Sequence, residues 1–180
     1  MRTQWIIIAL CLAPWAAAQD TTKKKSPVEV TRVSQPEKAL KVEVVVAGKP
    51  ADVWQAFTTS AGLDSWLWQD CTVDLREGGD WIVHYPGGHT GGGSIVSFRG
   101  GEQLVLHAMA PERFPEVRRV GTKAVFDFAA EGAGTRVTLT QTGWKEGKEW
   151  DDAHDYLAGG NAQLLEQLYV RFARGPIAWK

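Results

Sequence analysis

Most of the chain after residue 38 has the short alternation of apolar and polar positions that is typical of strands in an antiparallel sheet. Leu40, Val42, Val44 and Val46 alternate with other residues, which predicts a strand with one buried face. Similar patterns, several of them followed by glycine-containing turns, are found at 71–75, 81–85, 95–98, 104–109, 123–128 and 136–142. Because several of these strands follow one another through short connections, the pattern favours an antiparallel meander over βαβ units.

Two short helices are expected near the start of this run of strands. Pro50 suits the first turn of a helix, and Val53, Trp54 and Phe57 recur at helical spacing after it. A second short helix is expected at 61–66, where Gly62 weakens the pattern.

The longest helical pattern lies near the C-terminus and runs from about residue 151 to residue 173. A helix of this length measures roughly 35 Å at about 1.5 Å per residue. Its apolar stripe is formed by Leu157, Asn161, Leu164, Leu165, Leu168 and Phe172. The combination of an antiparallel sheet with one long helix predicts an α+β fold.

A pair of glycines, Gly159 and Gly160, interrupts the long helical pattern. Glycine inside a helix costs roughly 1 kcal/mol relative to alanine, so something in the fold should compensate. Two explanations remain open at this point. The glycines either allow the helix to pack closely on the sheet or leave space for a ligand beside Tyr156 and Leu164.

The N-terminal segment 1–18 has the layout of a secretory signal peptide. Arg2 supplies a positive charge, and the apolar run from Trp5 to Trp15 is too short to span a bilayer. Small residues end the segment at Ala18, where cleavage is expected. The sequence therefore predicts an exported protein, periplasmic or secreted, without a stable membrane anchor.

The remainder of the chain is expected to form one domain. Segment 19–37 is polar and is interpreted as a linker, with a short strand at 28–33 left open, and the domain itself is expected at 38–175. Cys71 is the single cysteine outside the predicted signal peptide, so no intramolecular disulfide is expected.

Composition limits the class of partner. The 180 residues include 44% hydrophobic and 23% charged residues, values typical of a soluble globular protein. The net charge of −1 argues against nucleic-acid binding through a basic surface. The nine tryptophans indicate a core or a pocket rich in large aromatic side chains.

No motif in the chain predicts a catalytic centre, a metal site or a cofactor site. The histidines at 84, 89, 107 and 154 do not form a close ligand pair, and no nucleophile elbow is present. The glycine-rich stretch 87–93 lacks the lysine and hydroxyl residue of a phosphate-binding loop and is interpreted as a flexible hairpin tip.

Several segments of the chain carry a recognisable set of motifs: Pro50–Trp54, Trp66–Trp68, the D-x-R-x-G-G-x-W segment Asp74–Trp81, Glu102–Leu106, Gly134–Thr140 and Gly143–Trp144. Together they resemble the family of the C-terminal domain of the activator of the heat-shock-protein-90 ATPase, in the SRPBCC (START/Bet v) superfamily. The resemblance covers about residues 40 to 173. It implies a helix-grip fold, in which a curved antiparallel sheet with two short helices closes over a long C-terminal helix on its concave face.

Within the D-x-R-x-G-G-x-W segment, Gly78 and Gly79 predict the turn between two antiparallel strands. Trp81, two residues later, is expected to face the long helix.

The resemblance also implies a ligand cavity between the sheet and the long helix. The family commonly has Gly-Trp in that helix, whereas this chain has Gly160 at the second position, which should enlarge the cavity unless Tyr156 or Tyr169 fills it. The expected ligand is an apolar small molecule, such as a lipid or a polycyclic compound. The expected lining residues are Trp66, Trp68, Trp81, Val83, Phe126, Phe128, Leu139, Tyr156, Gly160 and Leu164.

Family membership does not determine the activity, because this fold hosts carriers, cyclases and hydrolases. Tyr85, His107 or His154 would supply polar groups to a ligand. Two alternatives to a binding protein remain open. One is an enzyme of the cyclase or dehydrase type, with His107, His154 or Tyr156 as acid or base. The other is a protein-interaction domain that acts through the glycine-rich stretch.

Overall fold

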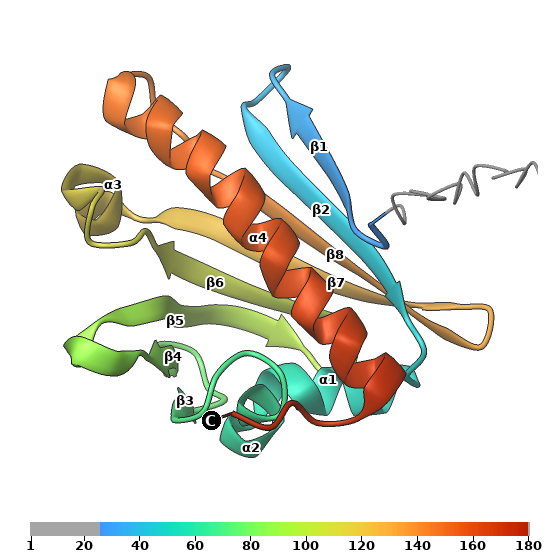
Figure 1. Cartoon of the computed structure of the whole chain (residues 1–180). Helices are drawn as coiled ribbons and strands as arrows, with labels where there is room; N and C mark the ends of the chain where they lie inside the picture. Colours follow the sequence, from blue (N-terminus) through green and yellow to red (C-terminus); the bar gives the residue numbers. More distant parts are fainter. Residues whose placement is uncertain (1–25, 180) are drawn as a thin grey trace, which may run out of the picture.

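The computed structural model describes residues 26–179, so residues 1–25 and residue 180 lie outside the described part of the chain (Figure 1). The predicted signal peptide and the first part of the predicted linker fall in this outer region. No helix within the described residues is long and apolar enough to cross a membrane.

The frame of the molecule is an eight-stranded antiparallel sheet. Its strands are β1 (Glu29–Val33), β2 (Ala39–Val46), β3 (Cys71–Val73), β4 (Asp80–His84), β5 (Thr90–Arg99), β6 (Gln103–Met109), β7 (Thr122–Glu131) and β8 (Gly134–Thr142). They are arranged in the order β1-β2-β8-β7-β6-β5-β4-β3. Strands β3 to β8 thus form the predicted meander, and β1 and β2 extend it from the β8 edge.

A long helix, α4 (Lys148–Arg174), runs across one face of this sheet (Figure 1). Two short helices, α1 (Pro50–Thr58) and α2 (Ser60–Asp64), lie near its C-terminal end. The α+β helix-grip fold predicted from the sequence is therefore confirmed. A further helix, α3 (Pro115–Val120), was not predicted, because only six residues form it and Val117 is its one buried residue.

The prediction of a flexible hairpin tip at 87–93 is wrong for Gly91–Gly93. These residues lie inside β5, paired with β4 on one side, and Gly92 and Gly93 are also paired with β6 on the other. A Cβ atom on Gly93 would lie 2.0 Å from the carbonyl oxygen of His107. The glycines therefore allow a close approach of neighbouring backbone, and the connection itself is limited to a single 3₁₀ turn, η1 (Pro86–Gly88).

The packed domain is longer than the predicted range 38–175. At its start, β1 pairs with β2 over five residues, so the strand left open at 28–33 is part of the sheet. At its end, the Ile177 N–H donates to the Ser65 carbonyl oxygen at 2.8 Å. The Trp179 indole N–H donates to the Asp64 carbonyl oxygen at 2.6 Å. The residues after α4 thus fold back onto α2.

Two groups of buried apolar residues hold α4 to the sheet. The larger core joins the sheet to α1, α2 and the C-terminal half of α4, where Leu165 and Leu168 are fully buried. The smaller core lies around the N-terminal half of α4 and contains Trp150, Phe114 and Val117. The middle of α4 lies between these two cores.

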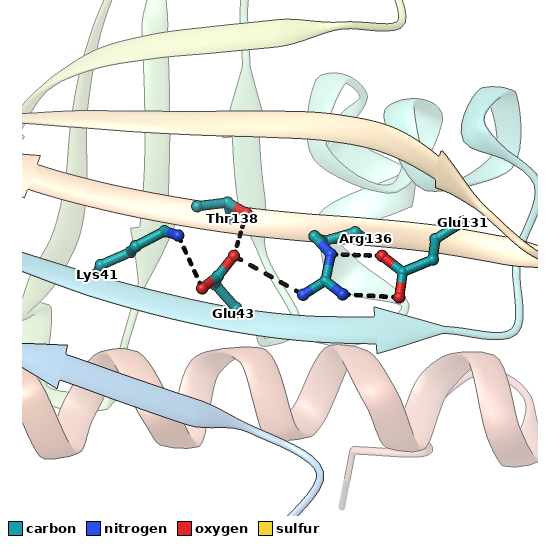
Figure 2. Close-up of polar contacts among 5 residues, drawn as sticks. All are labelled: Lys41, Glu43, Glu131, Arg136 and Thr138. Carbon is teal, nitrogen blue, oxygen red and sulfur yellow. Dashed lines mark hydrogen bonds and ion pairs between the residues drawn. The ribbon is translucent and has the colours of Figure 1, made fainter.

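The opposite face of the sheet carries a chain of charged and polar contacts (Figure 2). Lys41 lies 2.9 Å from Glu43 and Thr138 donates to Glu43 at 3.1 Å, while Arg136 pairs with Glu131 on the neighbouring strand. These contacts lower the pKa of Glu43, with the hydrogen bond from Lys41 as the largest cause. Since Val42 and Val44 beside Glu43 point into the core, this network lies away from the concave face and ties β2, β8 and β7 together.

Candidate functional site

A cavity of about 600 Å³ lies between the concave face of the sheet and the middle of α4. Its buried wall comes from the central strands and from α4. The buried residues of this wall are Trp81, Leu106, Ala124, Phe126, Leu139, Gln141 and Asn161. All but two of these side chains are apolar, so the cavity provides an environment suited to an apolar molecule.

The rim of the cavity is formed by exposed and partly exposed residues that flank the η1 turn, that precede α3 or that lie on α4. Tyr156 is 45% exposed, and its ring packs against that of Phe114 at 5.5 Å. The Arg113 guanidinium lies 4.8 Å from the centre of the Tyr156 ring. His89 and Glu112 are in contact at 2.9 Å and connect the two sides of the rim.

Arg118 holds two segments of this rim together through hydrogen bonds. Its guanidinium donates to the carbonyl oxygen of Ala110 at 2.7 Å and to the hydroxyl of Thr90 at 2.9 Å. These bonds join the start of β5 to the segment that precedes α3. The rim is therefore held by specific contacts between segments that are distant in sequence.

Gly160 opens directly onto the cavity. A Cβ atom built on Gly160 would meet no other atom within 4 Å, so the sheet does not close against the helix here. Tyr156 packs on Phe114 at the rim and Tyr169 packs in the larger core, so neither tyrosine fills this space. Of the two explanations for the glycine at 160, the structure favours open space over close packing.

The buried wall contains one polar network. The Asn161 amide donates to Gln141 at 2.8 Å, and the Gln141 amide donates to the Thr122 hydroxyl at 2.7 Å. Asn161 is 9% exposed and Gln141 is 4% exposed. The network links α4 to β8 and β7, while Asn161 and Gln141 also border the cavity.

Six of the ten residues expected to line the cavity are found there. They are Trp81, Phe126, Leu139, Tyr156, Gly160 and Leu164. Trp66, Trp68, Val83 and Phe128 do not line it. Their end of the sheet is covered by α1 and α2: Phe128 packs on Phe57 at 5.0 Å, and Trp66 packs on the same ring at 4.9 Å.

Gln141 and Asn161 line the cavity but were not predicted from the sequence to do so. A signal was present for Asn161, because this residue is the one polar member of the apolar stripe predicted for the long helix. Gln141 follows the alternation of β8, in which Val137, Leu139 and Gln141 share the buried face. A polar side chain at a buried position is more informative about a site than a buried apolar side chain, because burial of a polar group needs a specific reason.

Of the polar residues named from the sequence, Tyr85 and Tyr156 line the cavity but His107 and His154 do not. Burial is the main cause that raises the pKa of Tyr85, so its hydroxyl stays protonated. His107 is exposed, and its Nε2 contacts the carbonyl oxygen of Val120 at 2.9 Å. The structure therefore places neither of these two histidines where it can contact a ligand in the cavity.

His154 lines a separate groove of about 940 Å³ beside the start of α4. Its ring packs edge-on against Trp144 at 4.9 Å, and its Nε2 atom is buried without a hydrogen-bond partner among the described residues. Desolvation, with a smaller contribution from Lys38, lowers the pKa of His154. His154 is therefore a neutral, buried packing residue at neutral pH.

Two further features bear on reactivity. Burial raises the pKa of the Cys71 thiol to about 12, so this cysteine is not a nucleophile at neutral pH. Within residues 26–179, no three histidine, cysteine or acidic side chains gather in a way that could hold a metal ion.

Comparison with protein families gives a match to the family described as "Activator of Hsp90 ATPase homolog 1-like protein" over residues 47–173. The chain belongs to this family. The match begins just before α1 and ends near the C-terminus of α4, so it includes every helix and most strands of the fold. The sequence has no significant match among curated proteins.

Solved structures of similar fold agree with this assignment. The Aha1 dimer from Colwellia psychrerythraea has a TM-score of 0.62 at 19% identity, and the match covers 76% of this chain and 97% of that one. Protein MLL2253 from Mesorhizobium loti has a TM-score of 0.65 at 16% identity, with 77% and 99% covered. CalU16 from Micromonospora echinospora has a TM-score of 0.59 at 18% identity, with 82% and 87% covered. At these identities the similarity establishes the fold alone.

Proposed function

We propose that this chain is an exported binding protein that holds an apolar small molecule, such as a lipid or a polycyclic compound, between its sheet and α4. The observation that carries the proposal is the open space at Gly160, which lines the cavity and where a Cβ atom would meet nothing outside its own stretch of helix within 4 Å. Helix-grip domains of this superfamily commonly use this region for ligands. The cavity volume of about 600 Å³ falls within the usual range for small-molecule sites.

Export is the part of the proposal that rests on the sequence alone. The charged start, the short apolar run and the small residues up to Ala18 form a secretory signal, which predicts a mature chain that begins at Gln19. N-terminal sequencing of protein recovered from the periplasm or the medium tests this. Recovery of a chain that still begins at Met1, in the membrane fraction, would contradict it.

The contents of the cavity support a binding role more than an acid–base role. His107 and His154 lie elsewhere, and Tyr156, the third acid–base candidate, is exposed at the rim. Among the described residues, the buried wall carries no titratable side chain, and Gln141 and Asn161 are its polar members. In such a site the side chains bind and orient a molecule through shape and hydrogen bonds.

Binding can be measured with pyrene, a fluorescent hydrocarbon of four fused rings. Trp81 lies in the cavity wall, so a bound pyrene should quench tryptophan emission through energy transfer. We expect saturable binding to the folded protein and loss of binding after denaturation. Native mass spectrometry of protein purified from its own host should then reveal the natural occupant. Absence of saturable binding by pyrene and by its oxygenated derivatives would overturn the proposal.

A further inference from the structure

The cavity contains one polar position that binding of a hydrocarbon does not explain. Asn161 is nine-tenths buried on the inner side of α4 and borders the cavity. One N–H of its amide donates to Gln141 at 2.8 Å. Within residues 26–179, the amide oxygen and the second N–H of Asn161 make no hydrogen bond with another residue. The Asn161 amide oxygen is not among the buried side-chain atoms that lack a partner, so it is open to the cavity, where water or a ligand can bind it.

We infer that the cavity selects an uncharged hydrophobic ligand that carries a carbonyl or hydroxyl oxygen, which Asn161 binds with support from Gln141. The inference rests on the proposed function, because it requires that the cavity hold a ligand. A primary amide can donate to a carbonyl oxygen, and it can both donate to and accept from a hydroxyl. The bond to Gln141 fixes the orientation of the Asn161 amide, so its free donor and acceptor are held in place.

The distribution of charge indicates that the ligand is neutral. The charged residues around the cavity, Glu112 and Arg113, are exposed at the rim together with His89. No charged side chain lies among the buried residues of the wall in the described part of the chain. A carboxylate placed beside Asn161 would lose its hydration without meeting a cation, which is strongly unfavourable. A ketone or an alcohol loses far less.

A purely structural role of the network makes a different prediction. The bonds from Asn161 to Gln141 and from Gln141 to Thr122 tie α4 to the sheet, and this tie uses one N–H of Asn161. If the network has only this structural role, replacing Asn161, Gln141 or Thr122 should lower the free energy of unfolding and leave ligand selectivity unchanged. Thr122 does not border the cavity, so Thr122→Val is a control that weakens the network and leaves the ligand-facing atoms of Asn161 in place.

The test compares three probes, pyrene, pyrenemethanol and pyrenecarboxylate, by fluorescence titration. For each protein we take the affinity for pyrenemethanol divided by the affinity for pyrene. Comparing this ratio between a variant and wild type removes the effect of the different water solubilities of the two probes. Asn161→Leu is expected to lower this ratio about five- to tenfold, the effect of one net hydrogen bond, and to leave pyrene binding within about twofold. Thr122→Val is expected to keep the wild-type ratio. Pyrenecarboxylate is expected to bind wild type at least tenfold more weakly than pyrenemethanol.

Gln141→Met, which is similar in size and shape, provides a second variant if Asn161→Leu does not fold, and it should also lower the ratio. A ratio unchanged in the folded variants, or tightest binding by pyrenecarboxylate, would overturn the inference and leave the proposed function intact. Binding of none of the three probes to wild type would overturn both.

Discussion

Trp81 donates its indole N–H to the carbonyl oxygen of Phe57, in the last turn of α1, at 2.8 Å. Carbonyl groups in the last turn of a helix have no partner within the helix. The neighbouring carbonyl of Ala56 accepts from the Trp66 indole at 2.9 Å. The tryptophan of the D-x-R-x-G-G-x-W segment thus has two roles. Its indole N–H gives a hydrogen-bond partner to a carbonyl group at the end of α1, and its ring forms part of the cavity wall.

Trp81→Phe should therefore destabilise the fold. The Phe57 carbonyl would lose its donor in a buried position, and we expect the free energy of unfolding to fall by about 1–3 kcal/mol. Urea denaturation followed by circular dichroism measures this. Trp54→Phe is the control, because Trp54 packs on Phe128 and its indole N–H makes no hydrogen bond within residues 26–179. Equal losses in the two variants would contradict the hydrogen-bond explanation.

Gly79 is expected to be intolerant of any side chain. A Cβ atom there would lie 2.0 Å from the carbonyl oxygen of Asp74, so the backbone before β4 would have to shift. Gly79→Ala should lower the free energy of unfolding by about 1–3 kcal/mol, the usual cost of overpacking. Gly100→Ala serves as the comparison, because a Cβ atom at that hairpin turn meets nothing within 4 Å. If Gly79→Ala and Gly100→Ala melt at the same temperature, the predicted clash between a side chain at residue 79 and the Asp74 carbonyl oxygen is contradicted.

Acidification should destabilise the protein through His154. Burial keeps the pKa of His154 below the value of about 6.5 that histidine has in an unfolded chain. As the pH falls below that value, the unfolded chain takes up a proton before the folded protein does. Stability is therefore fully present above about pH 6.5 and declines as the pH falls toward the folded pKa.

The expected result is a fall in melting temperature between pH 7.5 and pH 5.5 that is smaller in His154→Leu. His107→Gln is the comparison variant, because it replaces a histidine at an exposed position that does not line the groove of His154. Lys38 and Asp155 lie near His154 and act on it in opposite directions, so the measurement is best made at low and at moderate ionic strength. A wild-type melting temperature that does not change over this range would exclude the explanation.

The fold could be predicted from the sequence because its signals are local. Alternation in β2 and in β8, the helical stripe of α4 and the Asp74–Trp81 segment each reflect short-range patterns, and all are found in the structure. Gly91–Gly93 could not be placed in the same way. Glycine is frequent both in mobile loops and in strands where backbones approach closely, and the contact with the His107 carbonyl exists only in three dimensions.

Gly160 is the cavity residue with the most specific signal in the sequence. Gly160 was identified because glycine is unfavourable inside a helix, which indicates a constraint from outside the helix. Trp66 and Phe128 were assigned to the cavity because large aromatic residues suit both cores and pockets. Which of the two they form depends on where α1 and α2 cover the sheet, and this information is not contained in their own segments.

Gly160→Trp provides the most direct test of the cavity. The open space at this position can accept a large ring, so the indole should occupy the cavity and abolish pyrene binding. Because tryptophan favours a helix more than glycine does, the melting temperature should stay the same or rise slightly. If the sheet instead closes against α4, the substitution would overpack the interior and lower the free energy of unfolding by about 1–3 kcal/mol.

Gly159→Trp is the matched control for this experiment. Gly159 is the preceding residue of the same helix, it is exposed, and it does not border the cavity. It shares the helix propensity of its neighbour, so Gly159→Trp should have a similar effect on intrinsic helix stability while pyrene binding remains as in wild type. The difference between the two variants then isolates the space at residue 160. Retained pyrene binding in Gly160→Trp would mean that the probe binds elsewhere, because a tryptophan at 160 and a ligand cannot occupy the same volume.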